Sequence, residues 1–236
     1  GGTLNLADFG GRRCFAGLDL SITTDLTALC LCFPPRRAPS IELAPMPDTL
    51  PPDEERPPPE DDDDDEPTAE ELAALKRDND SGPEPDADQC YSFFWWFWAP
   101  KKVREPFNQQ RYDQWEREGF IERTGERAIE YGFVRKRIAA LSREFDVQGW
   151  AYDPYNAKQF CEEQLGNEDG LSVFEFRQGD VSMNEPCKFF NRCLVTHHLR
   201  HGDNPVARWM AGNVAIKRGA TGLLKPDKER SADKID

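Results

Sequence analysis

The hydrophobic positions fall into two blocks separated by a long polar stretch. Residues 14–20 and 25–33 are almost continuously apolar and are joined by the turn-like sequence SITT. A third apolar run, QCYSFFWWFW at residues 89–98, ends just before Pro100. Short apolar runs that are bounded by turn signals are typical of strands buried on both faces. The pattern therefore predicts a hairpin and a third strand in one sheet.

The downstream block alternates between helical and extended patterns. Helical periodicity covers about 106–118, 129–145, 154–166 and 182–199, and extended patterns cover 147–153 and 171–176. A β-ribbon is predicted over ARWMAGNVAIKR (207–218) and GLLKP (222–226). A hairpin followed by alternating helices and strands predicts an α/β fold with a mixed sheet flanked by helices.

The polar stretch at residues 34–88 interrupts this pattern. It contains 13 of the 19 prolines, with 19 acidic and 5 basic residues, so that its net charge equals the −14 of the whole chain. Such a composition cannot bury enough apolar area to offset the entropy lost on ordering. We expect a disordered acidic insert, a solvated linker more readily than a mimic of DNA phosphate, within one domain formed by residues 1–33 and 89–236.

The seven cysteines indicate a reducing compartment. Their number is odd, they include no CxxC pair, and four lie inside apolar runs. Free thiols of this kind are typical of cytoplasmic proteins. No apolar run reaches the roughly 18–20 residues of a membrane span, and the first residues do not show a basic and then apolar pattern, so we expect neither a membrane span nor a secretion signal.

Three carboxylates end predicted elements in different parts of the chain. Asp19 ends the first strand, Asp153 ends the strand GWAYD, and Asp236 closes SADKID. Each has an ordinary structural explanation: a turn residue, a helix cap, or an acid in the first turn of a final helix that Ser231 would begin. Together they could hold two hard divalent cations, because ligands gather at the carboxyl ends of strands and oxygen ligands suit Mg²⁺ or Mn²⁺.

Five segments resemble the nuclease portion of the large terminase subunit of tailed phages. They occur in the family's order: AGLDLSITTDLTAL, AYDPYNAKQF, FRQGDVSMNEP, LRHGDNPVARWMAGNV and KPDKERSADKID. The resemblance implies a ribonuclease H-like fold and two-metal cleavage of concatemeric DNA during packaging. It also implies that Asp19, Asp153 and Asp236 are catalytic metal ligands and that Asp25 is a weaker accessory carboxylate. The implied partners are double-stranded DNA, a packaging ATPase domain, the small terminase subunit and the portal protein.

The sequence departs from this family in three places. It lacks the GxxxxGK[ST] phosphate loop of a packaging ATPase, it carries the acidic insert, and it stops at Asp236, where the family's last helix would continue. A helix of six residues from Ser231 is too short to persist alone. We therefore expect a nuclease domain truncated at its carboxyl end, with weak metal binding.

A basic region near the carboxyl end is a candidate DNA surface. Residues 188–230 contain nine Lys and Arg residues but three acids, and the residues expected to contact DNA are Arg200, Arg208, Lys217, Arg218 and Lys225. Cys193, His197 and His201 have helical spacing, but a zinc site is less favoured than a buried helix cysteine.

Three functional hypotheses remain open from the sequence. The first is a metal-dependent endonuclease that acts in DNA packaging in the cytoplasm of the host bacterium. The second is an inactive prophage remnant that binds DNA or protein. The third is another ribonuclease H-like nuclease such as a transposase or resolvase.

Overall fold

The computed structural model describes residues 4–21, 26–38, 85–103, 106–218, 224–228, 230, 231, 233 and 235. The acidic stretch from 39 to 84 lies outside the described residues, so its predicted disorder stays a prediction.

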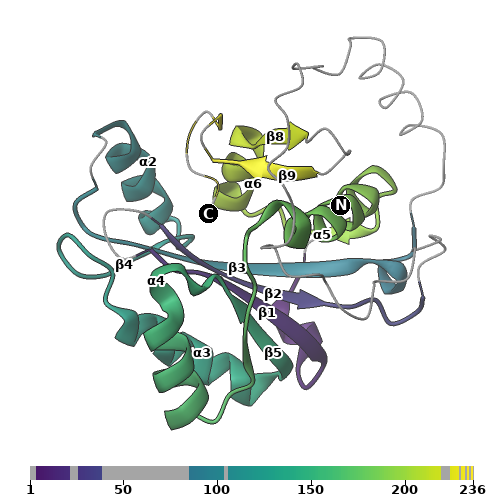
Figure 1. The fold of residues 1–236 in the computed structure, drawn as a ribbon, viewed down its shortest axis with the longest axis horizontal. Helices are drawn as coiled ribbons and strands as arrows, with labels where there is room; N and C mark the ends of the chain where they lie inside the picture. The colour runs from purple at the N-terminus through teal and green to yellow at the C-terminus, as the bar shows by residue number, and fades with distance from the viewer. Residues whose placement is uncertain are drawn as a thin grey trace.

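A mixed β-sheet forms the centre of the molecule (Figure 1). Its strands run in the order β4 (Glu122–Arg123), β3 (Tyr91–Ala99), β2 (Thr27–Phe33), β1 (Arg13–Asp19), β5 (Asp146–Tyr152) and β6 (Val173–Glu175), and β7 (Leu199–Arg200) also pairs with β3. Strands β1, β2 and β3 form an antiparallel meander, whereas β1, β5 and β6 are parallel. The predicted mixed sheet is confirmed.

Helices cover both faces of this sheet. The helical segments are η1 (Leu6–Phe9), η3 (Ala87–Gln89), α2 (Pro106–Arg117), α3 (Tyr131–Glu144), α4 (Pro154–Lys158), the π-helix η4 (Gln159–Glu168), α5 (Asp180–Val195) and α6 (Pro205–Asn213). In Figure 1, α3 and α4 lie below the sheet, whereas α5, α6 and a ribbon of β8 (Ala215–Arg218) and β9 (Leu224–Asp227) lie above it.

Two hydrophobic cores explain why the central strands are apolar throughout. On one face, Leu18 and Leu29 pack in a cluster with Ile138 of α3. On the other face, Phe97 clusters with Tyr112 of α2 and with Met210 of α6. A strand covered on both faces requires apolar side chains at odd and even positions alike, so its sequence reads as a run without alternation.

One predicted ribbon strand is largely a helix. The segment 207–218 was expected to be extended, but its first part belongs to α6 and only residues 215–218 form β8. Asn204 caps this helix, since its side-chain oxygen accepts hydrogen bonds from the backbone nitrogens of Val206 and Ala207, and Pro205 occupies the first turn. Both residues are strong helix-start signals, and the ribbon prediction overlooked them.

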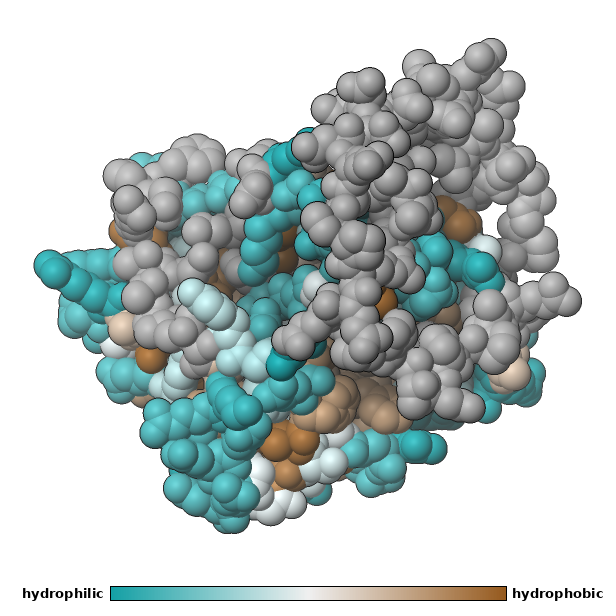
Figure 2. Space-filling model, viewed as in Figure 1, coloured by the Kyte–Doolittle hydropathy of each residue, from teal (hydrophilic) through white to brown (hydrophobic). Residues whose placement is uncertain are grey.

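The seven cysteines are all free, as expected. Burial raises the pKa of Cys14, Cys32 and Cys161 to about 12 in each case. Because the thiolate is the reactive form, these three thiols are chemically quiet at neutral pH. No helix of the described residues is long and apolar enough to cross a bilayer. Hydrophilic residues cover most of the described surface in Figure 2, with smaller hydrophobic patches between them.

The two ends of the acidic stretch lie side by side. The backbone nitrogen of Arg37 donates to the carbonyl oxygen of Asp88 over 2.9 Å. Arg36 pairs with Asp88, and Arg37 pairs with Asp86, both at 3.8 Å. The β2–β3 hairpin therefore closes on itself before residue 39 and after residue 84.

We expect the fold to survive replacement of residues 39–84 by about six Gly and Ser residues. Loop-closure entropy changes slowly with length, so the free energy of unfolding should stay equal or rise by up to about 2 kcal/mol. Urea unfolding followed by circular dichroism measures this change. Loss of cooperative unfolding would show instead that the replaced residues contribute to the packed domain.

Candidate metal centre

Two of the predicted metal ligands lie at the carboxyl ends of neighbouring strands, and this end of the sheet is called the acidic edge below. Strands β1 and β5 are adjacent and parallel, and Leu18 is the register partner of Tyr152. Asp19 and Asp153 each follow one of these partners, so they occupy neighbouring positions at the carboxyl ends of two strands. This edge is where open α/β sheets bind their ligands. The structure thus brings together two residues that are far apart in the sequence.

Asp19 lies beside a lysine from the carboxyl-terminal segment. The Nζ of Lys228 lies 3.4 Å from Oδ2 of Asp19, and the Asp19 side chain is 30% exposed. A partly exposed pair of this kind contributes little to stability, because solvent screens it. Asp19 can therefore exchange this partner for another cation at low cost.

Asp153 caps the helix that follows it. Its Oδ1 accepts a hydrogen bond of 3.0 Å from the backbone nitrogen of Tyr155. The helix-cap explanation of this residue is therefore correct. The cap uses one oxygen, and Oδ2 makes no hydrogen bond to the residues that the structure describes. Capping fixes the carboxylate in place and leaves an oxygen available for a ligand.

A third acidic residue at this edge was missed by the sequence analysis. Glu175 ends β6 and is the register partner of Tyr152. Its carboxylate pairs with Lys158 at 3.1 Å and with Arg177 at 4.0 Å. The available signal was its position at the end of a short apolar strand, as for Asp19.

The residue that precedes Asp153, Tyr152, is buried. The hydroxyl of Tyr152 donates to Glu162 over 3.0 Å. Burial first, and then this hydrogen bond, raise the pKa of Tyr152 well above its ordinary value. The phenol therefore stays protonated at neutral pH and remains a hydrogen-bond donor to Glu162.

Within the described residues, Asp19 and Asp153 supply only part of the set of oxygen ligands that a hard cation needs. In those ranges no three His, Cys, Asp or Glu side chains come close enough together to hold a metal ion. The two other predicted ligands, Asp25 and Asp236, lie outside the described residues, and their roles stay predictions. The less favoured zinc group at Cys193 gains no support, and Cys193 is a buried helix residue, as expected.

The carboxyl-terminal segment returns to this side of the sheet. Lys228 contacts Asp19, and Asp233 accepts a hydrogen bond of 3.3 Å from Asn108 of α2. The predicted helix start at Ser231 is not observed, since the described residues there are not helical. Instead, the Ser231 hydroxyl donates to the Asp227 carbonyl and accepts from the nitrogen of Ala215, which ties the segment to the ribbon.

The candidate DNA-binding residues do not all lie together. Lys217 and Lys225 are register partners in the ribbon, Arg218 follows Lys217, and Lys225 forms an ion pair with Asp180. Arg208 on α6 pairs with Asp203 at 2.7 Å. Arg200 in β7 pairs with the beginning of β3, whereas Asp19 lies near the far end of that strand. Arg200 is therefore at the opposite end of the sheet from the carboxylates.

The strand order and the flanking helices define a ribonuclease H-like α/β fold with an acidic edge. Residues 91–236 match the family described as the terminase large subunit, endonuclease domain, and the chain belongs to this family.

Two comparisons with the large terminase of phage HK97 agree with this family assignment. Its large terminase subunit is 30% identical over 152 residues, which cover 63% of this chain and 30% of that protein. The crystal structure of the HK97 large terminase superposes with a TM-score of 0.66 at 27% identity, covering 97% of this chain and 38% of the other. The chain thus spans about a third of the length of these relatives.

Proposed function

We propose that this chain is a metal-dependent endonuclease that cuts concatemeric double-stranded DNA during phage genome packaging. One observation carries the proposal beyond the family assignment: Asp19 and Asp153 occupy adjacent positions at the carboxyl ends of parallel strands. Unrelated segments supply these carboxylates, as two-metal phosphodiester hydrolysis requires.

The residues that would hold two Mg²⁺ or Mn²⁺ ions are Asp19, Asp153 and Asp236, with Asp25 as a weaker fourth. Bound there, the ions would supply an activated water and charge stabilisation for the leaving oxygen. Asp153 would offer Oδ2 while its Oδ1 stays engaged with Tyr155. Asp19 would exchange Lys228 for the ions, which frees the ammonium group for the negatively charged backbone of the substrate.

The DNA is proposed to approach over the ribbon. Lys217, Arg218 and Lys225 lie on β8 and β9, and Lys228 follows directly and reaches Asp19. A basic ribbon next to the acidic edge would bind backbone phosphates with little sequence preference and with strong salt dependence. By family, the proposed partners are the packaging ATPase domain, the small terminase subunit and the portal protein, in the cytoplasm of the host.

Plasmid cleavage tests the proposal directly. We expect the chain to nick and linearise supercoiled plasmid in Mn²⁺ or Mg²⁺, and we expect EDTA to abolish the reaction and excess Mn²⁺ to restore it. Gel electrophoresis measures the products. No cleavage under any divalent ion, together with retained binding to duplex DNA, would favour the prophage-remnant alternative. The family match argues against a transposase or resolvase.

A further inference from the structure

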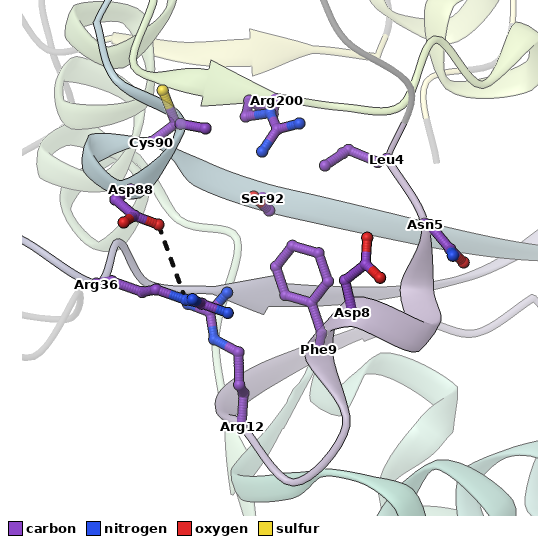
Figure 3. Close-up of a pocket in the computed structure, with 11 residues that line it drawn as sticks. Leu4, Asn5, Asp8, Phe9, Arg12, Arg36, Asp88, Cys90, Ser92 and Arg200 are labelled. Carbon is purple, nitrogen blue, oxygen red and sulfur yellow. Dashed lines mark ion pairs between the residues drawn. The ribbon is translucent and has the colours of Figure 1, made fainter.

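A small polar pocket lies at the end of the sheet opposite Asp19 (Figure 3). Its volume is about 170 Å³, and it is bounded by η1, the beginnings of β1 and β3, the residues after β2, and β7. Arg12 in its wall precedes Asp19 by seven residues, which is about 23 Å at the ~3.3 Å rise of a strand. The pocket is therefore separate from the candidate metal centre.

Three arginines from different parts of the chain line this pocket: Arg12, Arg36 and Arg200. The acids in its wall are Asp8 and Asp88, so the wall carries one more positive than negative charge. Burial first, and then the nearby charge of Arg36, lower the pKa of Arg12. Arg12 and Arg36 thus place like charges in one pocket, the nearby Asp88 offsets them in part, and a bound anion would offset them further.

Arg12 is held in place before any ligand arrives. Its Nη2 donates to the Pro34 carbonyl over 2.8 Å, and its guanidinium lies over the rings of Phe9 at 4.7 Å and Phe33 at 5.8 Å. A guanidinium fixed in this way loses little side-chain entropy on binding a tetrahedral oxyanion.

Arg200 and Ser92 form the opposite wall. They are register partners of the parallel strands β7 and β3, so their side chains share one face of the sheet. Arg200 has no ion pair with the described residues. Ser92 is only 3% exposed, and it lines the pocket together with Arg200. Its hydroxyl can donate a hydrogen bond to an oxyanion that enters the pocket.

Arg36 is held by a contact that a ligand can replace. It pairs with Asp88 at 3.8 Å, drawn as the dashed line in Figure 3, and their side chains are 56% and 42% exposed. Such exposed pairs contribute little, so an anion can displace Asp88 from Arg36 without a large penalty.

We propose that this pocket binds a single phosphate-class oxyanion through Arg12, Arg36, Arg200 and Ser92. The volume is below the roughly 300–1,000 Å³ of pockets that enclose drug-sized ligands, so it suits one phosphoryl group more than a whole nucleotide. The phosphoryl group is either free inorganic phosphate or a phosphodiester of a DNA backbone. This site stands independently of whether the metal centre cuts DNA.

Calorimetric titration of the full chain with inorganic phosphate at low ionic strength tests the site. We expect saturable one-site binding that weakens about tenfold or more in Arg36→Gln and in Arg200→Gln, because each loses a charge-assisted contact. Asp88→Asn should tighten binding, since it removes the competitor for Arg36. Arg37→Gln is the matched control: Arg37 makes an equivalent pair with Asp86 but does not line the pocket, so its phosphate affinity should match the parent.

A second arm identifies the source of the phosphoryl group. In an Asp19→Asn background that prevents cleavage, fluorescence anisotropy measures binding of a short duplex. If the ligand is a DNA phosphodiester, inorganic phosphate competes with the duplex, and Arg36→Gln weakens duplex binding about tenfold while Arg37→Gln does not. If the ligand is free phosphate, Arg36→Gln changes phosphate binding alone.

Two results would overturn the proposal. One is the absence of saturable phosphate binding by the folded parent chain. The other is binding that Arg36→Gln, Arg200→Gln and Asp88→Asn all leave unchanged, with circular dichroism showing that these variants are folded.

Discussion

Asp19→Asn and Asp153→Asn should each reduce plasmid cleavage by about 10³-fold or more in Mn²⁺. Each substitution removes the negative charge that would bind a divalent ion but keeps the size of the side chain. The loss corresponds to about 4 kcal/mol of transition-state stabilisation, at 1.36 kcal/mol for each factor of ten. Initial rates of supercoiled plasmid loss, at equal protein concentration, measure the effect.

Both substitutions should reduce cleavage without lowering the stability of the fold. Asn is as good a helix N-cap as Asp, so Asp153→Asn can keep the hydrogen bond from Tyr155. Asp19 is partly exposed, and its ion-pair partner among the described residues is Lys228, whose charge is screened by solvent. Both variants should therefore unfold at the same temperature as the parent, within about 2 °C.

Asp146→Asn is the matched control. Asp146 begins β5, the strand that leads to Asp153, and it is exposed at the other end of the sheet. Its substitution should leave the cleavage rate within about twofold of the parent. If Asp19→Asn and Asp153→Asn cleave as fast as Asp146→Asn, the two carboxylates do not form the catalytic centre.

Trp150→Ala should lower the free energy of unfolding by about 3–5 kcal/mol. Trp150 lies in the middle of β5, is 1% exposed, and is the register partner of Ala16 and Val173 on the two neighbouring strands. Removing the indole leaves a cavity beside the strand that positions Asp153. At about 2–4 °C for each kcal/mol, the midpoint of thermal unfolding should fall by roughly 6–20 °C.

Tyr155→Ala is the control for this loss. Tyr155 is also aromatic and lies five residues further on, but it is 79% exposed. Its truncation should change stability by no more than about 0.5 kcal/mol. Differential scanning calorimetry compares the variants, and equal midpoints for Trp150→Ala and Tyr155→Ala would contradict the assignment of Trp150 to the core.

The sequence alone determined the elements that have strong local signals. The apolar runs at 14–20, 25–33 and 89–98 correspond to β1, β2 and β3, because strands covered on both faces need apolar residues throughout. The end of β5 just before Asp153 was also evident, since an apolar run meets a polar helix start there. The resemblance of short motifs correctly indicated the family.

Only the tertiary structure decided which distant residues meet. The register of β1 against β5 places Asp19 beside Asp153, and no local pattern encodes that pairing. The same holds for Lys228 at Asp19, which depends on how the ribbon returns to the sheet. It holds also for Arg12, Arg36 and Arg200, which line one pocket because the start of β1, the end of β2 and strand β7 lie at the same end of the sheet. Local propensity acts over a few residues, whereas these contacts arise from strand order and packing across the whole chain.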